Sequence, residues 1–533
     1  MKRNYFKSIV YSSLILGTAM VSSCTKDFDE MNAPWKDAQT ADVKSLFNGV
    51  VASIELGAQE QATANTWIYP VTQLGTTVGN SGYSMQNASN ELWENYYRAL
   101  ISIRLTDRMI NESPDKSKYQ NVQAMLTILK AYKTFKMTDI FGDIPYSEAG
   151  MADQGPTNYR PVFDSQKSIY ENLLNDLKTA VATLSTSADQ INIGSSESML
   201  NNDIALWKKF GNSLRLRYAL RMNDANATVA ATHIKEALTL PLLENTENIG
   251  LTPAVQNFTG EWREWSFHAG IYLRMGSTAW NMLSDNNNVN GSGIFDPRAK
   301  IYFETNAKNE WVAKPQNQAM SDGGEPYNRR RDDDWSNKGA GNLISNFNYY
   351  FGRDKNIPEL IITAAEVYFL KAEAAVKGIG NANGMAAAKT EYENGVKSSI
   401  NFWTSMAMKS VVWKENKPTS LPTNAQLNTI LSNPKVAFSA SLSSTNALKL
   451  IYAQRWLDNF RQPYEAWALA RQTDATPKST VDNNFYENEF GYIHRLNYAD
   501  KEYQYNRDNT LEATKGQTFA KEWQTTKMWW DVN

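Results

Sequence analysis

Aromatic and planar polar side chains gather in the segments of the sequence that are richest in Gly, Asn, Asp and Pro. Trp and Tyr rings bury a large area at a modest cost in conformational entropy, and they can stack on the flat C–H faces of sugars. Asn, Asp and Arg side chains can bond the hydroxyl groups of such a ligand in a fixed geometry. Packing within the loops and contact with a partner protein remain alternative roles for each ring. The candidate ligand-binding residues are Trp67, Tyr83, Trp262, Trp265, Tyr327, Arg330, Arg331 and Trp335.

The sequence carries no recognisable catalytic motif. It contains no G-x-S-x-G elbow, no P-loop and no dinucleotide-binding fingerprint in a suitable context. A glycosidase needs two carboxylates that flank the scissile bond, and Glu261 with Glu264, or the run from Asp332 to Asp334, could supply them. Acidic residues are common in the loops of any soluble chain, so a solvated loop is the better interpretation. We therefore expect a binding protein and not an enzyme, with a glycosidase as the less favoured alternative.

The histidines do not form a metal-ligand pattern. His233, His268 and His494 are far apart in the sequence and lack a motif such as H-E-x-x-H. The segment Asn286–Gly291 faintly resembles a calcium loop, but it lacks the leading Asp, and Pro297 stands where the closing Glu should be. We expect neither a metal site nor a cofactor.

Helical periodicity dominates the body of the sequence. In Leu92–Ile110, for example, Trp93, Tyr97, Leu100 and Ile103 recur at steps of three and four residues. The paired segments, joined by short loops, predict a mostly α fold of stacked, degenerate helix–turn–helix repeats with a few short strands. The same pattern predicts helices over Val122–Phe135, Ser165–Leu184, Asp203–Met222, Pro358–Lys377, Met385–Trp403 and Ala447–Ala470.

The character of the chain changes between about residues 240 and 356. Gly, Asn, Asp and Pro accumulate there, as in Ser284–Gly293 and Ser321–Gly341. Long irregular segments inside a compact protein usually carry function or are disordered. The alternating stretch Lys300–Glu304 could form a small hairpin. Beyond this region, Pro358 is expected in the first turn of a helix and Gly378 at its end.

The N-terminus has the parts of an export signal. Lys2, Arg3 and Lys7 form a positive segment, and the apolar stretch Ile9–Val21 is too short for a comfortable membrane span. Small residues directly precede Cys24, the only cysteine of the chain, and this pattern resembles the lipobox of bacterial lipoproteins. We predict a signal peptide over residues 1–23, a lipidated flexible tether over 24–43 and one folded domain over 44–533.

Charge and hydropathy restrict where the protein acts. The net charge of −2 offers no basic field for nucleic acid. No apolar run after the signal segment is long enough to span a membrane, so the acyl chains on Cys24 are the expected anchor. The acidic run Asp27–Glu30 resembles the signal that sends some lipoproteins to the outer face of the outer membrane. A simple solvated tether is the alternative role for this run.

A series of short motifs runs in order along nearly the whole chain. Each motif is weak alone, but together they resemble those of the SusD/RagB family of outer-membrane nutrient-binding lipoproteins. The motifs are Phe141–Tyr146 (FGDIPY), Arg160–Tyr170 (RP, FD and IY), Trp207–Arg217 (WKKFGNSLRLR), Asp296–Arg298 (DPR), Ala365–Ala374 (AEVYFLKAEA), Gln454–Trp467 (QRW and EAW), Ile493–Tyr498 (IHRLNY) and Trp529–Asp531 (WWD).

The resemblance implies a single helical domain with four degenerate tetratricopeptide-type repeats. It also implies a partner, a SusC-like β-barrel transporter driven by TonB, which the lipoprotein covers as a hinged lid with ligand trapped between the two. The implied location is the outer membrane, facing the cell exterior. The implied ligand is an oligosaccharide. A peptide is the alternative ligand, because some relatives resemble peptide importers, but the aromatic loops favour the oligosaccharide.

Most motif residues look structural. Trp207 and Trp456 lie at helical spacing and are expected in the core, and Asn212 and Arg217 are expected in a buried polar network. Asp474 departs from the family pattern, in which Gly often stands at this place. The aromatic-rich centre matches little of the family beyond the DPR motif, so the resemblance does not name the ligand.

Overall fold

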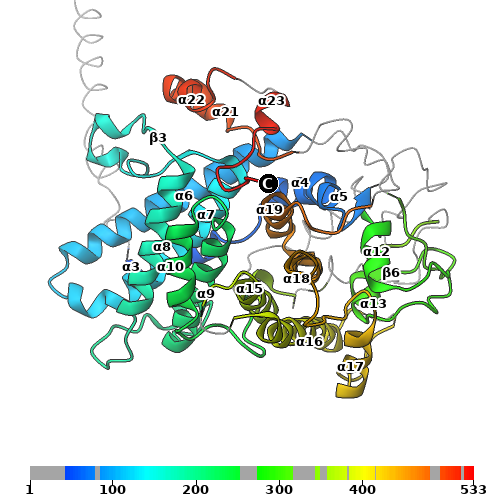
Figure 1. Ribbon diagram of the computed structural model, residues 1–533. Helices are drawn as coiled ribbons and strands as arrows, with labels where there is room; N and C mark the ends of the chain where they lie inside the picture. Colours follow the sequence, from blue (N-terminus) through cyan, green and yellow to red (C-terminus); the bar gives the residue numbers. More distant parts are fainter. Residues whose placement is uncertain are drawn as a thin grey trace, which may run out of the picture.

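Figure 1 shows a computed structural model of the protein, in which most of the chain folds into helices that pack side by side. The structure describes residues 42–77, 84–251, 273–315, 343–348, 354, 357–380, 383–413, 416–479, 493–517 and 521–533. No helix in this described part is both long and apolar enough to cross a membrane.

Consecutive helices pack in pairs. Each long helix between residues 85 and 221 contacts the next, and so does each long helix between residues 364 and 473. Because α9 (Ile204–Arg221) also contacts α15 (Ala364–Val376), the pairs join into one continuous stack (Figure 1). This arrangement confirms the predicted mostly α fold of helical repeats. The pairs are α6 (Met85–Glu112) with α7 (Gln120–Phe141), α8 (Gln166–Thr183) with α9 (Ile204–Arg221), α15 (Ala364–Val376) with α16 (Met385–Lys409), and α18 (Ser444–Asp458) with α19 (Pro463–Thr473).

Local interactions set where these helices begin and end. The carboxylate of Asp203 accepts a hydrogen bond from the backbone N–H of Leu206 at 3.0 Å and caps α9. The hydroxyl of Thr363 does the same for the N–H of Glu366 at 3.0 Å in α15. Each such cap typically stabilises a helix by ~1 kcal/mol. Gly378 follows α15 with a φ of 69°, which confirms its predicted role as a helix stop.

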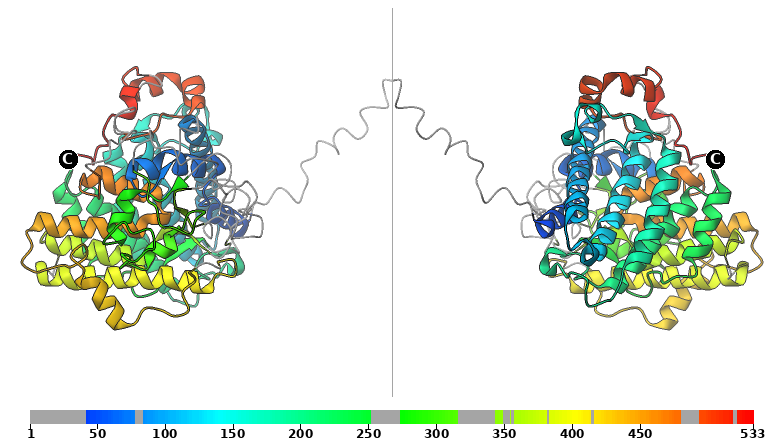
Figure 2. Two further views of the ribbon diagram at one scale, coloured as in Figure 1. Left: turned by 90° about the vertical axis from the view of Figure 1, so that its right-hand side faces the viewer. Right: turned by 90° about the vertical axis from the view of Figure 1, so that its left-hand side faces the viewer.

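Shorter helices surround this stack. Near the C-terminus, α21 (Asp500–Tyr505) packs on α6, and α22 (Arg507–Ala513) packs on β3 (Phe163–Asp164). These two helices form a layer at the top of the molecule (Figures 1 and 2). The other α-helices are α3 (Val43–Ala52), α4 (Ala58–Thr63), α5 (Tyr69–Thr72), α10 (Ala227–Ala237), α12 (Ser277–Leu283), α13 (Arg298–Tyr302), α17 (Asn424–Ser432), α21 (Asp500–Tyr505), α22 (Arg507–Ala513) and α23 (Lys521–Gln524). A π-helical turn, η2 (Ala64–Ile68), lies between α4 and α5, and the 3-10 turns are η3 (Lys116–Tyr119), η4 (Ala152–Gln154), η5 (Pro156–Asn158), η6 (Gly194–Ser196) and η7 (Asn459–Arg461).

The strands are short, antiparallel and gathered into three small sheets. The first sheet has the order β1 (Thr76–Thr77), β5 (Leu273–Arg274), β7 (Asn346–Phe347) and β6 (Phe303–Glu304). The second pairs β2 (Ile144–Pro145) with β3 (Phe163–Asp164), and the third pairs β4 (Ile249–Leu251) with β8 (Glu359–Ile362).

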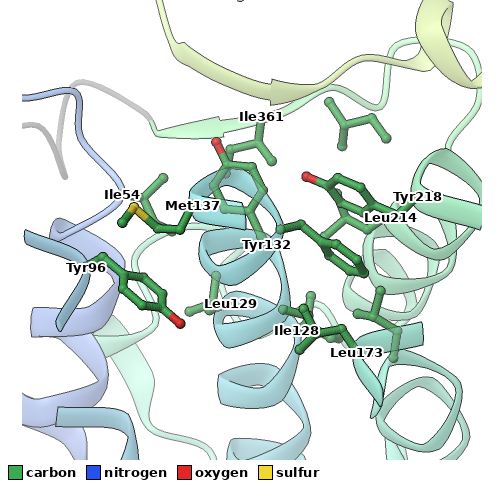
Figure 3. Close-up of a cluster of buried hydrophobic side chains, with 14 of the residues drawn as sticks. Ile54, Tyr96, Ile128, Leu129, Tyr132, Met137, Leu173, Leu214, Tyr218 and Ile361 are labelled. Atoms are coloured by element: carbon green, nitrogen blue, oxygen red, sulfur yellow. The ribbon is translucent and has the colours of Figure 1, made fainter. Parts of the chain in front are cut away.

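The buried apolar side chains form two clusters. One is centred on α6 to α9, where Tyr132, Leu214 and Tyr218 point toward one another from neighbouring helices (Figure 3). The rings of Phe135 and Tyr218 stack there with their centroids 3.8 Å apart. The other cluster fills the space between α12, α13, α16 and α18. Trp207 and Trp456 are 0% exposed, which confirms both as core residues.

Three local predictions are wrong. The segment Ala447–Ala470 is not one helix, because α18 ends at Asp458 and α19 begins at Pro463. Pro358 does not start a helix, because the residues after it form strand β8, which pairs with β4, and α15 begins only at Ala364. The stretch Lys300–Glu304 is not a hairpin, because Lys300 belongs to α13 and only Phe303–Glu304 is a strand. Strand β8 pairs with β4 and β6 pairs with β7, so pairing with a strand remote in sequence overrides the local pattern after Pro358 and at Phe303–Glu304.

Candidate functional site

The four-stranded sheet gathers residues from widely separated parts of the chain. Arg274 lies opposite Thr76 on one side and Asn346 on the other, and Asn346 in turn lies opposite Glu304. All four residues are buried. A row of polar residues that crosses a buried sheet is thus assembled from four segments.

Aromatic rings pack beneath this sheet and attach it to η7 and the end of α18. Phe347 packs edge-on against Tyr69 and Phe303, with centroids 5.1 and 5.4 Å apart. The hydroxyl of Tyr69 donates to the backbone carbonyl of Phe460 at 2.6 Å, and that of Tyr302 donates to the carbonyl of Leu457 at 3.0 Å. Buried rings with satisfied hydroxyls hold an element rigidly. The sheet is therefore firmly attached to the helical body of the protein.

Most of the predicted site residues lie outside the described residues. This holds for Cys24, Tyr83, Trp262, Trp265, Tyr327, Arg330, Arg331 and Trp335. The described ends of the segments that carry the seven ligand candidates nevertheless converge. Residues 78–83 follow β1 directly, residues 252–272 precede β5 directly, and residues 316–342 end four positions before Asn346 of β7. The structure thus brings the described residues next to three candidate segments to one sheet, although these segments are remote in sequence.

Trp67 is the one candidate ligand residue within the described part of the chain. It lies in η2 and is 5% exposed. Its ring belongs to the core cluster around α6 to α9, so packing is the role that the structure assigns to it. A contact between its remaining exposed edge and a ligand stays a prediction.

Sequence reasoning missed Gln73, which ties three segments together near the sheet. Its backbone is left-handed, with a φ of 59°, at the end of α5. Its side-chain oxygen accepts hydrogen bonds from the hydroxyl of Thr278 at 2.6 Å and from the backbone N–H of Ser479 at 2.7 Å. The sequence carries no signal for this position, because Gln rarely marks a left-handed residue.

The sequence also gave no sign of two buried cationic side chains, one in the sheet and one beside it. Arg274 and Lys314 are both 0% exposed, and both interact with other groups inside the protein. The backbone of Lys314 accepts from Ser277 and donates to Met275, each at 2.9 Å, and so extends the sheet region. Because buried charges must be paired or hydrogen-bonded, these two residues support the loop bases and are not free to attract a charged ligand.

Several residues of the family-like motifs lie in a buried ionic network. The guanidinium of Arg217 donates to Glu366 of α15 at 2.9 Å, and Arg455 of α18 donates to the same carboxylate at 2.9 Å. Arg221 bonds Glu465 of α19 at 2.5 Å and also pairs with Asp139 of α7. This network confirms that Arg217 is a buried network residue. Asn212 is likewise 0% exposed and donates to the carbonyls of Ala237 and Pro241.

Within this network, nearby arginines stabilise the charged form of Glu465, whereas burial raises the pKa of Asp139. Burial opposes ionisation of the Glu465 carboxyl, but Arg217 and Arg221 outweigh it and lower its pKa to about 2. Burial raises the pKa of Asp458, on α18, to about 6, despite the hydrogen bond that Thr363 donates to it. The network therefore fastens α7, α9, α15, α18 and α19 together and is a scaffold, not a ligand site.

The Asn-rich segment discounted as a calcium loop uses its side chains in turns. The amide oxygen of Asn286 accepts from the N–H of Asn288 at 3.0 Å, and that of Asn290 accepts from the N–H of Ser292 at 2.9 Å. These are Asx turns, in which a side chain satisfies a nearby backbone donor. Within the described ranges, no group of three or more His, Cys, Asp or Glu side chains is placed to hold a metal ion.

Solved structures with this fold cover nearly the whole chain. A chitin-binding protein matches with a TM-score of 0.72 at 21% identity, over 92% of this chain and 100% of that chain. A SusD homologue from Parabacteroides distasonis matches with a TM-score of 0.67 at 20% identity, over 92% and 98%. A chitin-binding SusD homologue from Flavobacterium johnsoniae matches with a TM-score of 0.66 at 22% identity, over 92% and 99%. At these identities the matches establish the fold alone.

The sequence places the chain in a family. No curated protein matches it. The family model described as "Starch-binding associating with outer membrane", a SusD-like family, matches residues 36–499, which is most of the chain. The protein therefore belongs to the SusD-like family of starch-binding proteins that associate with the outer membrane.

Proposed function

We propose that this protein is a cell-surface lipoprotein that captures oligosaccharides and passes them to a transporter in the outer membrane. The observation that carries the proposal is the match of a starch-binding, outer-membrane family over residues 36–499. Two structures with the same fold are described as chitin-binding, which supports a glycan as the ligand class. We propose that binding without catalysis is its whole activity.

The candidate loops give the proposal a physical basis. Trp262, Trp265, Tyr327 and Trp335 offer ring faces for stacking on sugars, and Arg330 and Arg331 offer donors for hydroxyl groups. Their loops start or end at the four-stranded sheet, whose underside is packed with rings. A ligand site needs such support, because a loosely held side chain loses entropy when it binds.

The partner in this proposal is a SusC-like β-barrel driven by TonB, with the protein as its hinged lid. An acylated Cys24 would keep the lid beside the barrel. A flexible tether of about 20 residues has a root-mean-square span of roughly 25 Å, so the lid can open without leaving its partner. The acidic run after Cys24 supports an outward-facing position on the cell surface.

Replacing Trp262 or Trp265 by Ala is expected to weaken glycan binding by ~2 kcal/mol or more, about 30-fold in Kd, if either ring is a hot spot. Titration calorimetry against chitin, starch and cellulose oligosaccharides measures this loss. Tyr505→Ala is the matched control, because Tyr505 is a 70% exposed ring on α21. Unchanged affinity in both Trp variants would remove these residues from the site.

The same titrations separate the proposed ligand class from its alternatives. A peptide ligand would pair with backbone groups more than with stacked rings, so peptide binding that survives both Trp substitutions would favour a peptide importer. Turnover of any oligosaccharide by the purified protein would contradict the binding proposal and favour a glycosidase.

A further inference from the structure

A cavity lies beside α13, and none of its described lining residues belongs to the four-stranded sheet. Its volume is about 740 Å³, within the roughly 300–1,000 Å³ that is typical of small-molecule sites. Lys300 and Ile301 of α13 line it, whereas the next residue, Tyr302, stacks on Phe460 in the core with centroids 4.0 Å apart. α17 forms another wall and projects from the lower edge of the molecule (Figures 1 and 2). We name this space the α13–α17 cavity.

The described lining of the α13–α17 cavity combines apolar surface with neutral polar groups. Phe295, Trp413 and Leu421 contribute a ring, an indole and an aliphatic chain. Hydroxyl and amide side chains from α17 and the segment before it line the rest. Asp285 and Lys300 are the charged members of this described lining, and their charges are opposite, so its net charge is zero.

The walls of the cavity are held in place by hydrogen bonds between remote segments. The amide of Asn433 donates to both carboxylate oxygens of Asp285, at 3.0 and 3.1 Å. The ammonium of Lys435 donates to the backbone carbonyls of Asn281 and Ser284, each at 2.6 Å. These bonds fasten the end of α12 to the segment that follows α17. A cavity braced in this way needs little ordering when a ligand enters.

We propose that the α13–α17 cavity is a second ligand site, and that its occupant is a short neutral sugar such as a disaccharide. A lining with no net charge has little to offer an anion or a cation. An acyl chain would match only the apolar part of the lining and would form no hydrogen bonds with its hydroxyl and amide groups. A sugar ring has an apolar face and a rim of hydroxyl groups, and the two kinds of lining complement both.

The choice of a sugar as occupant rests on the proposed glycan function, whereas the cavity itself does not. The site is separate from the sheet, because none of the described residues that line the cavity belongs to the four strands. A second site would let the protein hold a longer glycan at two places, or retain a sugar product close to the site where the chain is captured.

A substitution that fills the cavity tests the proposal. Thr429 lines the cavity on an exposed part of α17, whereas Asn428 is exposed on the same helix and does not line it. Thr429→Trp should block the cavity, and Asn428→Trp is the matched control. Both are made in wild-type protein and in a Trp262→Ala/Trp265→Ala double variant. Saturation-transfer difference NMR measures contact with maltose, cellobiose and chitobiose, each at millimolar concentration, and circular dichroism checks the fold.

The expected result is a saturation-transfer signal that persists in the double variant, is retained with Asn428→Trp and is lost with Thr429→Trp. Equal signals with the two α17 substitutions would overturn the cavity site. A signal present in the wild type but absent from the double variant would also overturn it, while leaving the proposed glycan function intact. Conversely, loss with Thr429→Trp and no effect of the double substitution would support the cavity and contradict the loop site. No signal for any sugar with the wild type would overturn the sugar as occupant of both.

Discussion

At the residue scale, Asp474 has a backbone conformation that favours Gly, the residue that the family resemblance led us to expect there. It caps the end of α19 with a left-handed backbone, at a φ of 44°. A side chain with a Cβ atom is strained in this conformation, although Asp tolerates it better than most residues. The carboxylate also pairs with Lys478 at 2.7 Å, but both groups are partly exposed, and such pairs contribute little.

Asp474→Gly is therefore expected to raise the free energy of unfolding by about 0.5–1 kcal/mol, because Gly reaches the left-handed region without strain. Urea denaturation followed by circular dichroism measures the change. Asp474→Ala should lower the stability by a similar amount, and Lys478→Ala should change it by less than about 0.5 kcal/mol. A gain with Ala equal to that with Gly would show that the backbone conformation is not the cause.

At the scale of the elements, the buried ionic network joins repeat helices in addition to the apolar contacts between them. Glu465 of α19 bonds Arg221 at 2.5 Å and lies 3.7 Å from Arg217, and both arginines are on α9. Removing one partner from such a group leaves a buried charge without compensation, which costs about 3–5 kcal/mol. The motifs that mark the family therefore preserve the junction between the repeats.

Glu465→Gln is expected to destabilise the protein by about 3 kcal/mol at neutral pH. The folded pKa of Glu465 is about 2, below the ordinary value of a carboxyl group, so its contribution is fully present above about pH 4.3 and is lost as the pH falls towards 2. The difference between wild type and variant should therefore shrink across this range. Denaturation curves at several pH values measure it.

The control for this experiment is Glu94→Gln, since Glu94 forms an exposed pair with Arg98 on α6. Its effect is expected to stay below about 0.5 kcal/mol at every pH. If the Glu465 variant differs from wild type by the same amount at pH 7 and pH 2, the carboxylate is not stabilised by the arginines as the geometry indicates.

At the scale of the whole molecule, we propose that the N-terminal segment attaches the protein to the membrane. The described helices contain no membrane span. The described body begins at Asp42, whose carboxylate caps α3, and a tether would join it there. The lipid on Cys24 is then the proposed anchor, and the barrel is the proposed neighbour.

Cys24→Ala is expected to release the protein from the membrane fraction, because the proposed acyl chains, at ~0.8 kcal/mol per buried CH₂, would hold the wild type there. Fractionation and immunoblotting measure the release. Tagged wild-type protein purified from membranes should bring a large β-barrel with it, identified by mass spectrometry. A Cys24→Ala protein that stays in the membrane fraction after normal signal cleavage would show that the lipid is not the only attachment.

The sequence determined the parts of this protein that depend on neighbours along the chain. The periodicity in Leu92–Ile110 and Val122–Phe135 lies inside α6 and α7, and Gly378 follows the end of α15 as predicted. Helical periodicity, caps and stops act over a few residues, so they are visible in the sequence. The ordered motifs likewise identified the family before any tertiary contact was known.

Only the tertiary structure decided how remote segments meet. Arg217 and its partner Glu366 are separated by 149 residues, and no local pattern joins them. Strand β8 stands where a helical turn was predicted, because it pairs with β4. Gln73 has a left-handed backbone, and its side chain bonds Thr278 and Ser479. Register and packing between distant residues select such contacts, and their energies do not appear in any short stretch of sequence.

The candidate site shows the same division. The sequence pointed to the aromatic loops, because rings in polar segments are hard to explain as core. The structure brought the ends of those loops to one sheet, buried Trp67 in the core and opened the α13–α17 cavity, to which sequence reasoning had not pointed. A residue type is written in the sequence, whereas its exposure and its neighbours arise only when the chain has packed.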